Sequence, residues 1–124
     1  MVERNNHGSG VLALAETVCG YRRIYRQAGQ PGWLTTSISR PAMLGRLDAA
    51  LVEGPERFQS RRLLGECRSF VRLSGGATGA RAGTHDDRVM AMAIGLAVRA
   101  ELLESGKSNC RPQSALAPHS SRCA

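Results

Sequence analysis

Two adjacent aspartates, Asp86 and Asp87, stand just before the longest apolar run of the chain. Every position of residues 89–98 is apolar or glycine, so a helix built from this run would be apolar on all sides and would belong in the middle of a core. Like charges repel, and a carboxylate next to a low-dielectric interior costs free energy unless it is paired or bound to a cation. The aspartate pair therefore needs a chemical explanation.

Two explanations fit these residues. The spacing Thr84-x-x-Asp87 matches a capping box, and acids in a first helical turn suit the positive end of the helix dipole. Alternatively, the two carboxylates are ligands of a divalent metal, because their oxygens suit magnesium or manganese. Short motifs often arise by chance, so the pentapeptide at residues 84–88 favours capping when it is taken alone.

Glu3 is a third carboxylate of interest, because it precedes the turn-forming residues 5–8. An acid near a chain end is commonly a solvated surface charge. If Glu3 instead lies at a strand end and faces Asp86 and Asp87, three carboxylates converge, as in a two-metal phosphodiesterase whose ions lie ~3.5–4 Å apart. Such a centre needs one further carboxylate. Three other acids lie on or after expected helices and are not well placed for that role: Asp48, Glu53 and Glu66.

These side chains must be positioned by a small set of elements. Apolar residues at helical spacing predict four helices, over residues 9–19, 40–53, 60–71 and 86–104. We expect a strand at residues 22–26, loops at 27–39 and 75–83, and either helix or strand at 69–73. At 124 residues the chain can form one small domain.

The composition indicates which partners to expect. The formal net charge is +7 and Lys107 is the only lysine, so almost all the positive charge is arginine, whose planar fork suits phosphate. A polyanion such as nucleic acid is therefore a plausible partner, although arginines also serve as ordinary solvated faces. The candidate contacts with DNA are Arg22, Arg23, Arg61 and Arg62.

The cysteines and the ends of the chain indicate the compartment. Four dispersed cysteines with no C-x-x-C pair do not indicate a zinc site or a disulfide framework. No apolar run approaches the ~20 residues that span a bilayer, and the N-terminus carries no hydrophobic signal region. We expect a cytoplasmic protein with no membrane contact.

The order of motifs resembles a known family. The motifs are Val-Glu-x-Asn-Asn-x-Gly, Gly-Trp-x-Thr, Arg-Pro-x-Met-Leu, Arg-x-Leu-x-Gly-Glu-x-x-x-Phe-Val and, after a glycine-rich loop, Gly-x-His-Asp-Asp-x-Val-Met-Ala-x-Ala-Ile. Together they resemble the C-terminal part of the nuclease domain of the terminase large subunit, the DNA-packaging motor of tailed bacteriophages. The resemblance covers roughly residues 2–100.

The resemblance implies a fold and an activity. The fold would be α/β and ribonuclease-H-like, with a small mixed sheet flanked by helices. An acidic cluster would bind two Mg²⁺ or Mn²⁺ ions and cut concatemeric double-stranded DNA during packaging. Partners would be double-stranded DNA, the portal and the small terminase subunit, and the setting would be the cytoplasm of a bacterial host of a phage or prophage.

The resemblance also assigns residues. Glu3 matches the second acidic position of the cluster, and Asp86 and Asp87 match the last. Which aspartate is the direct ligand stays open, with a preference for Asp87. Asn5 and Asn6 would fix the turn that presents Glu3, and His85 would support the aspartates, although ordinary turn and cap roles fit these three equally well.

The sequence departs from the family in two ways. Family members carry the first catalytic aspartate on an opening strand upstream of the position of Glu3, and an ATPase half precedes the nuclease. No G-x-x-x-x-G-K-[ST] phosphate loop occurs in this sequence. We therefore expect residues 1–104 to be a truncated nuclease domain without its opening strands, and residues 105–124 to be a disordered basic tail. Such a fragment would be marginally stable, and inactive unless a companion chain complements it. The alternative is a non-catalytic basic module that binds DNA or another partner.

Overall fold

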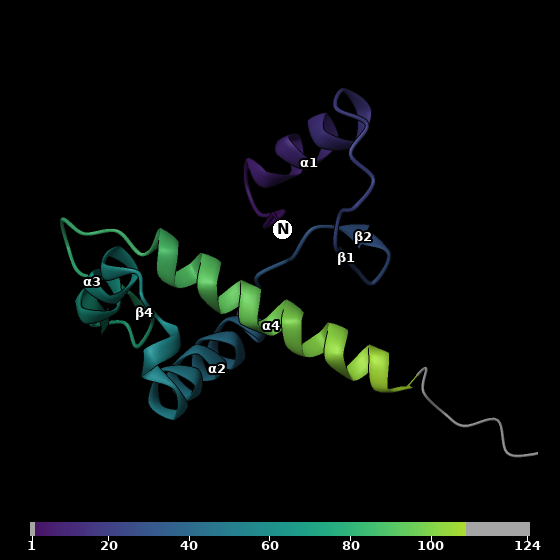
Figure 1. The fold of residues 1–124 in the computed structure, drawn as a ribbon. Helices are drawn as coiled ribbons and strands as arrows, with labels where there is room; N and C mark the ends of the chain where they lie inside the picture. Colours follow the sequence, from purple (N-terminus) through teal and green to yellow (C-terminus); the bar gives the residue numbers. More distant parts are fainter. Residues whose placement is uncertain (1, 109–124) are drawn as a thin grey trace, which may run out of the picture.

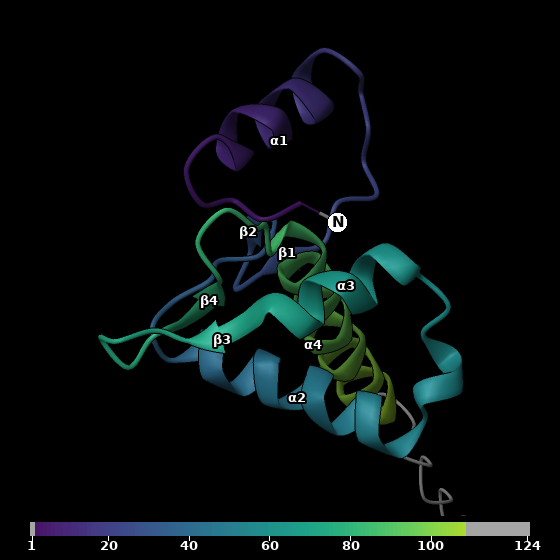
Figure 2. The same cartoon turned by 90° about the vertical axis from the view of Figure 1, so that its left-hand side faces the viewer.

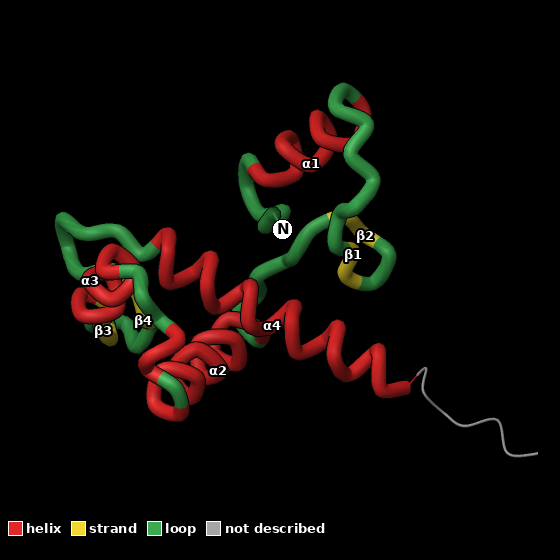
Figure 3. The backbone as a smooth tube through the Cα atoms, viewed as in Figure 1, coloured by secondary structure: helices red, strands yellow, loops and turns green. Residues whose placement is uncertain are grey.

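The computed structural model describes residues 2–108. The helices are α1 (Gly8–Thr17), α2 (Ser39–Glu53), α3 (Arg61–Ser69) and α4 (Asp87–Ser108), with a short 3-10 turn, η1 (Pro55–Arg57). The strands are β1 (Arg26–Gln27), β2 (Gln30–Pro31), β3 (Phe70–Arg72) and β4 (Thr78–Ala80). The α/β class is confirmed. The prediction of a single mixed sheet is wrong for the described residues, because their strands form two separate antiparallel hairpins, β1–β2 and β3–β4 (Figure 3).

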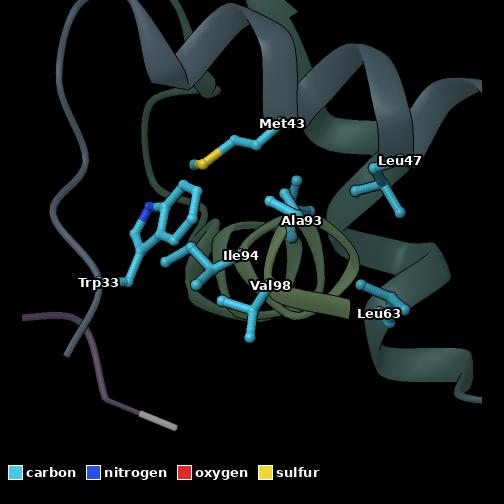
Figure 4. Packing of buried hydrophobic residues seen from close by; sticks show 9 residues of the cluster. Trp33, Met43, Leu47, Leu63, Ala93, Ile94 and Val98 are labelled. Atoms are coloured by element: carbon cyan, nitrogen blue, oxygen red, sulfur yellow. The ribbon is translucent and has the colours of Figure 1, made fainter. Parts of the chain in front are cut away.

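Helix α4 is the centre of the fold. The first helix and the β1–β2 hairpin lie on one side of α4, and α2, α3 and the β3–β4 hairpin lie on the other (Figure 1, Figure 2). Ile94 of α4 packs with Trp33 and Met43 (Figure 4). The other buried members of this cluster are Leu47, Leu63, Val89, Ala93, Ala97 and Val98.

The prediction that residues 89–98 are buried on all sides is only partly correct. Val89, Ala93 and Ile94 are buried, but Ala91 is exposed. Three larger apolar residues of the same helix are only half-buried: Met90, Met92 and Leu96. Residues 2–108 therefore cover one side of α4 well and leave a strip of the helix partly open.

Short hairpins replace two of the expected loops. Residues 27–39 contain most of the β1–β2 hairpin, which turns at Gly29, where φ is +79°. Residues 75–83 contain β4, and the turn before it passes through Gly76, where φ is +80°. Glycine adopts such angles without steric penalty, so these two positions let the chain reverse direction. The expected strand at residues 22–26 reduces to its last residue.

The boundaries after α3 also differ from the expectation. Helix α3 ends at Ser69 and β3 follows at once, so the strand alternative for residues 69–73 is confirmed at residues 70–72. Helix α4 continues to Ser108, so the expected tail is wrong at residues 105–108. The remainder of that expected tail, 109–124, lies outside the described residues. No helix within residues 2–108 is both long and apolar enough to cross a membrane.

The N-terminal segment pairs with the chain just after β2. Glu3 and Trp33 form a parallel bridge, in which the Arg4 N–H donates to the Trp33 carbonyl (2.7 Å) and the Trp33 N–H donates to the Val2 carbonyl (3.0 Å). Parallel pairing needs a crossover connection, and α1 provides it. Only Leu12 of this helix is buried, so α1 is attached mainly through the segments at its two ends.

Candidate functional site

One cavity of about 460 Å³ lies between the N-terminal segment and the start of α4. The three acids predicted from the sequence, Glu3, Asp86 and Asp87, all line this cavity, which we call the acid cavity. Asn5 and Asn6 line it as well. The remaining lining residues come from α2, α4 and the segment before α2: Thr35, Arg40, Met90, Ala91 and Ile94. The fold therefore brings one acid of the N-terminal segment and two acids at the start of α4 to one space.

The acids share the cavity without forming a ready-made coordination shell. In the part of the chain that the structure describes, no three His, Cys, Asp or Glu side chains are grouped closely enough to hold one ion. The donor types nevertheless fit Mg²⁺ or Mn²⁺, which prefer carboxylate oxygens and water. The Thr35 hydroxyl oxygen is buried and makes no hydrogen bond within residues 2–108. Water carried by a cation in this cavity could satisfy that oxygen.

The backbone around Glu3 depends on two glycines. A Cβ atom on Gly8 would lie 1.6 Å from the Glu3 carbonyl oxygen, and one on Gly32 would lie 2.8 Å from the Val2 carbonyl oxygen. Gly32 also has a φ of +79°, which disfavours any other residue. Only glycine at both positions lets the N-terminal segment come this close, so these two residues set where Glu3 is presented.

The two asparagines fix the turn after Glu3. The Asn5 side-chain amide donates to the Thr35 carbonyl (2.9 Å), and its oxygen accepts from the Thr35 N–H (3.1 Å). Asn6 adopts a left-handed conformation with φ of +50°, which asparagine tolerates better than most residues. His85, the third expected supporting residue, is exposed and lies outside the cavity lining, and it makes no hydrogen bond to either aspartate in the described residues.

The predicted capping box at the start of α4 is not formed. The Thr84 hydroxyl donates to the Arg81 carbonyl (2.6 Å) instead of accepting from the first turn. The cap comes from α3, where the Glu66 carboxylate accepts from the backbone N–H groups of Arg88 (2.7 Å) and Val89 (3.4 Å). An acid from another helix thus satisfies the free N–H groups of the first turn. Asp86 and Asp87 are left available for another role.

Glu66 is buried, with 8% of its surface exposed, and its carboxylate also pairs with the Arg88 guanidinium. Burial raises the pKa of this carboxyl, but the hydrogen bonds from Arg88 and Val89 and the Arg88 charge outweigh that effect, so its pKa lies below the usual value. Glu66 is therefore ionised near neutral pH. Sequence reasoning set this residue aside, although an acid three residues after Leu63 on the apolar face of a helix was a usable signal.

Arg40 is the second residue that sequence reasoning missed. Its Nη2 donates to the Thr78 carbonyl (3.0 Å) and lies 3.8 Å from the Asp86 Oδ2. Asp86 therefore has a partial counter-charge. The carboxylates of Glu3 and Asp87 make no hydrogen bond or ion pair to any residue between 2 and 108, so they are free to take a cation.

The four candidate DNA-contacting arginines lie away from the acids. Arg22 and Arg23 are exposed between α1 and β1, and Arg61 and Arg62 are exposed at the start of α3. None of them lines the acid cavity.

Comparison of the chain with models of known protein families, with curated proteins and with solved structures finds no match.

Proposed function

We propose that this chain is the C-terminal part of the nuclease domain of a tailed-bacteriophage terminase large subunit, with a ribonuclease-H-like fold. The parent activity is metal-dependent cleavage of concatemeric double-stranded DNA during genome packaging. The observation that supports this most is the single cavity lined by Glu3, Asp86 and Asp87. The cap supplied by Glu66 adds support, because the aspartates are then not needed to accept the Arg88 and Val89 N–H groups of the first turn.

In this proposal Glu3, Asp86 and Asp87 hold Mg²⁺ or Mn²⁺. Ions held by these carboxylates would supply an activated water and would stabilise the leaving oxygen of an in-line displacement. Glu3 and Asp87 provide unpaired carboxylates, and Asp87 is the preferred direct ligand. Asp86 is shared between the ion and Arg40, whose guanidinium lies 3.8 Å from that carboxylate. Asn5 holds the N-terminal segment in place.

A two-metal centre needs one carboxylate more than this cavity provides. We assign that carboxylate to an opening strand, carried by a companion chain or segment that also bears the ATPase. Losing one ligand from such a centre removes electrostatic stabilisation of the transition state, commonly worth ~3 kcal/mol or more. The chain alone therefore cleaves DNA weakly or not at all.

A plasmid-nicking assay with Mn²⁺ tests this proposal. The full chain is assayed alone and mixed with a polypeptide that carries the ATPase and the opening strand, using Asp87→Asn as the site variant. Asp48→Asn, at an exposed position of α2, makes the same charge change away from the cavity. We expect cleavage in the mixture that requires Mn²⁺, is lost with Asp87→Asn and persists with Asp48→Asn. Efficient cleavage by the chain alone would refute the proposal that its metal centre lacks one carboxylate. Cleavage that survives Asp87→Asn would refute the proposal that Asp87 holds the metal.

A non-catalytic DNA-binding module is the second candidate. It is favoured by the exposed arginines Arg61 and Arg62, which make no ion pair within residues 2–108. This candidate requires DNA affinity that falls steeply with salt, that is unaffected by Mn²⁺ and that is never accompanied by cleavage.

A further inference from the structure

A second cavity, of about 490 Å³, lies between the start of α2 and the β3–β4 hairpin. Figure 2 shows this hairpin beside the first turns of α2. We call this cavity the hairpin groove. Its lining residues are Ser37, Arg40, Pro41, Leu44, Arg72, Gly76, Ala77 and Thr78, and they include two arginines and no acid.

The hairpin groove adjoins the acid cavity through Arg40, which lines both. The Arg40 Nη2 donates to the carbonyl of Thr78, on the wall of the groove, and lies 3.8 Å from the carboxylate of Asp86, on the wall of the acid cavity. A ligand that spans both spaces would therefore meet carboxylates on one side of this guanidinium and positive charge on the other.

The charges of the groove fit a phosphate. Arg72 is exposed and forms no ion pair with any described residue, and Arg40 uses only its Nη2 in the contacts above. Guanidinium groups have five N–H donors and bind phosphate oxygens in pairs. Pro41 and Leu44 add apolar surface to the lining of the groove, which suits a sugar or a base. The volume lies within the ~300–1,000 Å³ typical of small-ligand pockets.

We propose that the hairpin groove holds one nucleotide of a DNA strand, adjacent to the phosphate that is cut in the acid cavity, with the phosphate of that nucleotide between Arg40 and Arg72. The cutting in this statement rests on the proposed nuclease function. The groove itself requires only that a polynucleotide binds with phosphate at the two arginines.

The test measures DNA binding by the full chain without metal, in EDTA, by fluorescence anisotropy of a labelled duplex across a range of salt concentrations. Arg72→Gln should weaken binding roughly threefold or more and reduce the salt slope by about 1, because one phosphate contact is lost. Ala77→Phe should weaken binding with the slope unchanged, because it fills the groove and leaves both arginines in place. Arg46→Gln, an exposed arginine of α2 outside the groove, is the matched charge control and should bind like the wild type.

Wild-type binding by both Arg72→Gln and Ala77→Phe would overturn the proposal, as would an equal loss in Arg46→Gln. Far-UV circular dichroism and thermal melting check that each variant is folded. If Ala77→Phe does not fold, Arg72→Gln decides the question, because it changes an exposed side chain. A deoxynucleoside monophosphate that competes as strongly as an oligonucleotide would also overturn it, because the groove would then bind a free nucleotide. The nuclease proposal fails separately, if Mn²⁺-dependent cleavage of the plasmid survives Asp87→Asn.

Discussion

The Asn5 side chain and the Thr35 backbone hold each other through two hydrogen bonds, of 2.9 and 3.1 Å. This pairing ties the N-terminal segment to the segment that leads into α2. Both residues line the acid cavity. The position of Glu3 relative to the rest of the cavity therefore depends on a contact between two parts of the chain that are remote in sequence.

Asn5→Ala removes both hydrogen bonds and leaves the N–H and carbonyl of Thr35 without these partners. We expect a loss of about 1–3 kcal/mol in the free energy of unfolding, measured by urea denaturation. Amide hydrogen exchange at Thr35 should accelerate as well. Asn5→Asp keeps the acceptor for the Thr35 N–H but sets a carboxylate oxygen against the Thr35 carbonyl and adds a negative charge to the acid cavity, so it should also lose stability. Unchanged stability and unchanged exchange in Asn5→Ala would show that the pairing does not hold the segment.

Gly8 and Gly10 form a matched pair within α1. A Cβ atom at position 8 would lie 1.6 Å from the Glu3 carbonyl oxygen, whereas one at position 10 meets nothing within 4 Å. Gly10→Ala should stabilise the chain by up to ~1 kcal/mol through helix propensity. Gly8→Ala should destabilise it by about 1–3 kcal/mol, because the N-terminal segment must move. Equal effects in urea denaturation would contradict the close approach of Glu3 to α1.

The cap from Glu66 predicts a pH dependence of stability. The pKa of this carboxyl is lower in the folded chain than its ordinary value of 4.5. The ionised carboxylate therefore stabilises the fold above that value, and the stabilisation is lost as the pH falls through the folded pKa. Thermal melting between neutral pH and about pH 3 should show this loss in the wild type.

Glu66→Gln keeps the shape of the side chain and removes its charge. We expect a lower melting temperature at neutral pH and a weaker decline on acidification. Glu53→Gln, at an exposed position of α2, is the control and should melt like the wild type. If Glu66→Gln has the same pH profile as the wild type, the carboxylate does not cap α4 as a charged group.

The partly open strip of α4 predicts low stability. Met92 and Leu96 of α4 are only half-buried. Elsewhere, Leu14 on α1 and Val18 just after it are exposed at 60% and 74%. Apolar surface left in contact with water contributes nothing to folding. We expect the free energy of unfolding of the chain alone to be about 5 kcal/mol or less, at the lower limit for natural domains. A monomer with a high, cooperative melting midpoint would contradict this expectation.

The helices could be predicted because their apolar residues repeat at helical spacing. Met43 and Leu47, four residues apart, are both buried on α2, and the apolar run after Asp87 forms the central helix. The hairpins could not be predicted, because strands of two or three residues carry no alternation pattern. They depend on turns at glycines with positive φ, such as Gly29 and Gly76.

The acids of the cavity could be proposed from residue type and order, but their surroundings could not. Arg40 and Glu66 act across elements, Arg40 on Asp86 and Glu66 on the first turn of α4. No local spacing encodes either contact, because each depends on how the helices pack. Glu66 still left a trace, as a charged residue on an apolar helical face, whereas Arg40 left none.

In the proposed function, Glu3 and Asp87 face a common cation. The most direct test of this arrangement is Mn²⁺ binding to the full chain by electron paramagnetic resonance, comparing the wild type with Glu3→Gln, Asp87→Asn and the control Asp48→Asn. We predict that Glu3→Gln and Asp87→Asn each weaken Mn²⁺ binding roughly tenfold or more, while Asp48→Asn binds like the wild type. Wild-type Mn²⁺ affinity in either Glu3→Gln or Asp87→Asn would contradict a shared metal site.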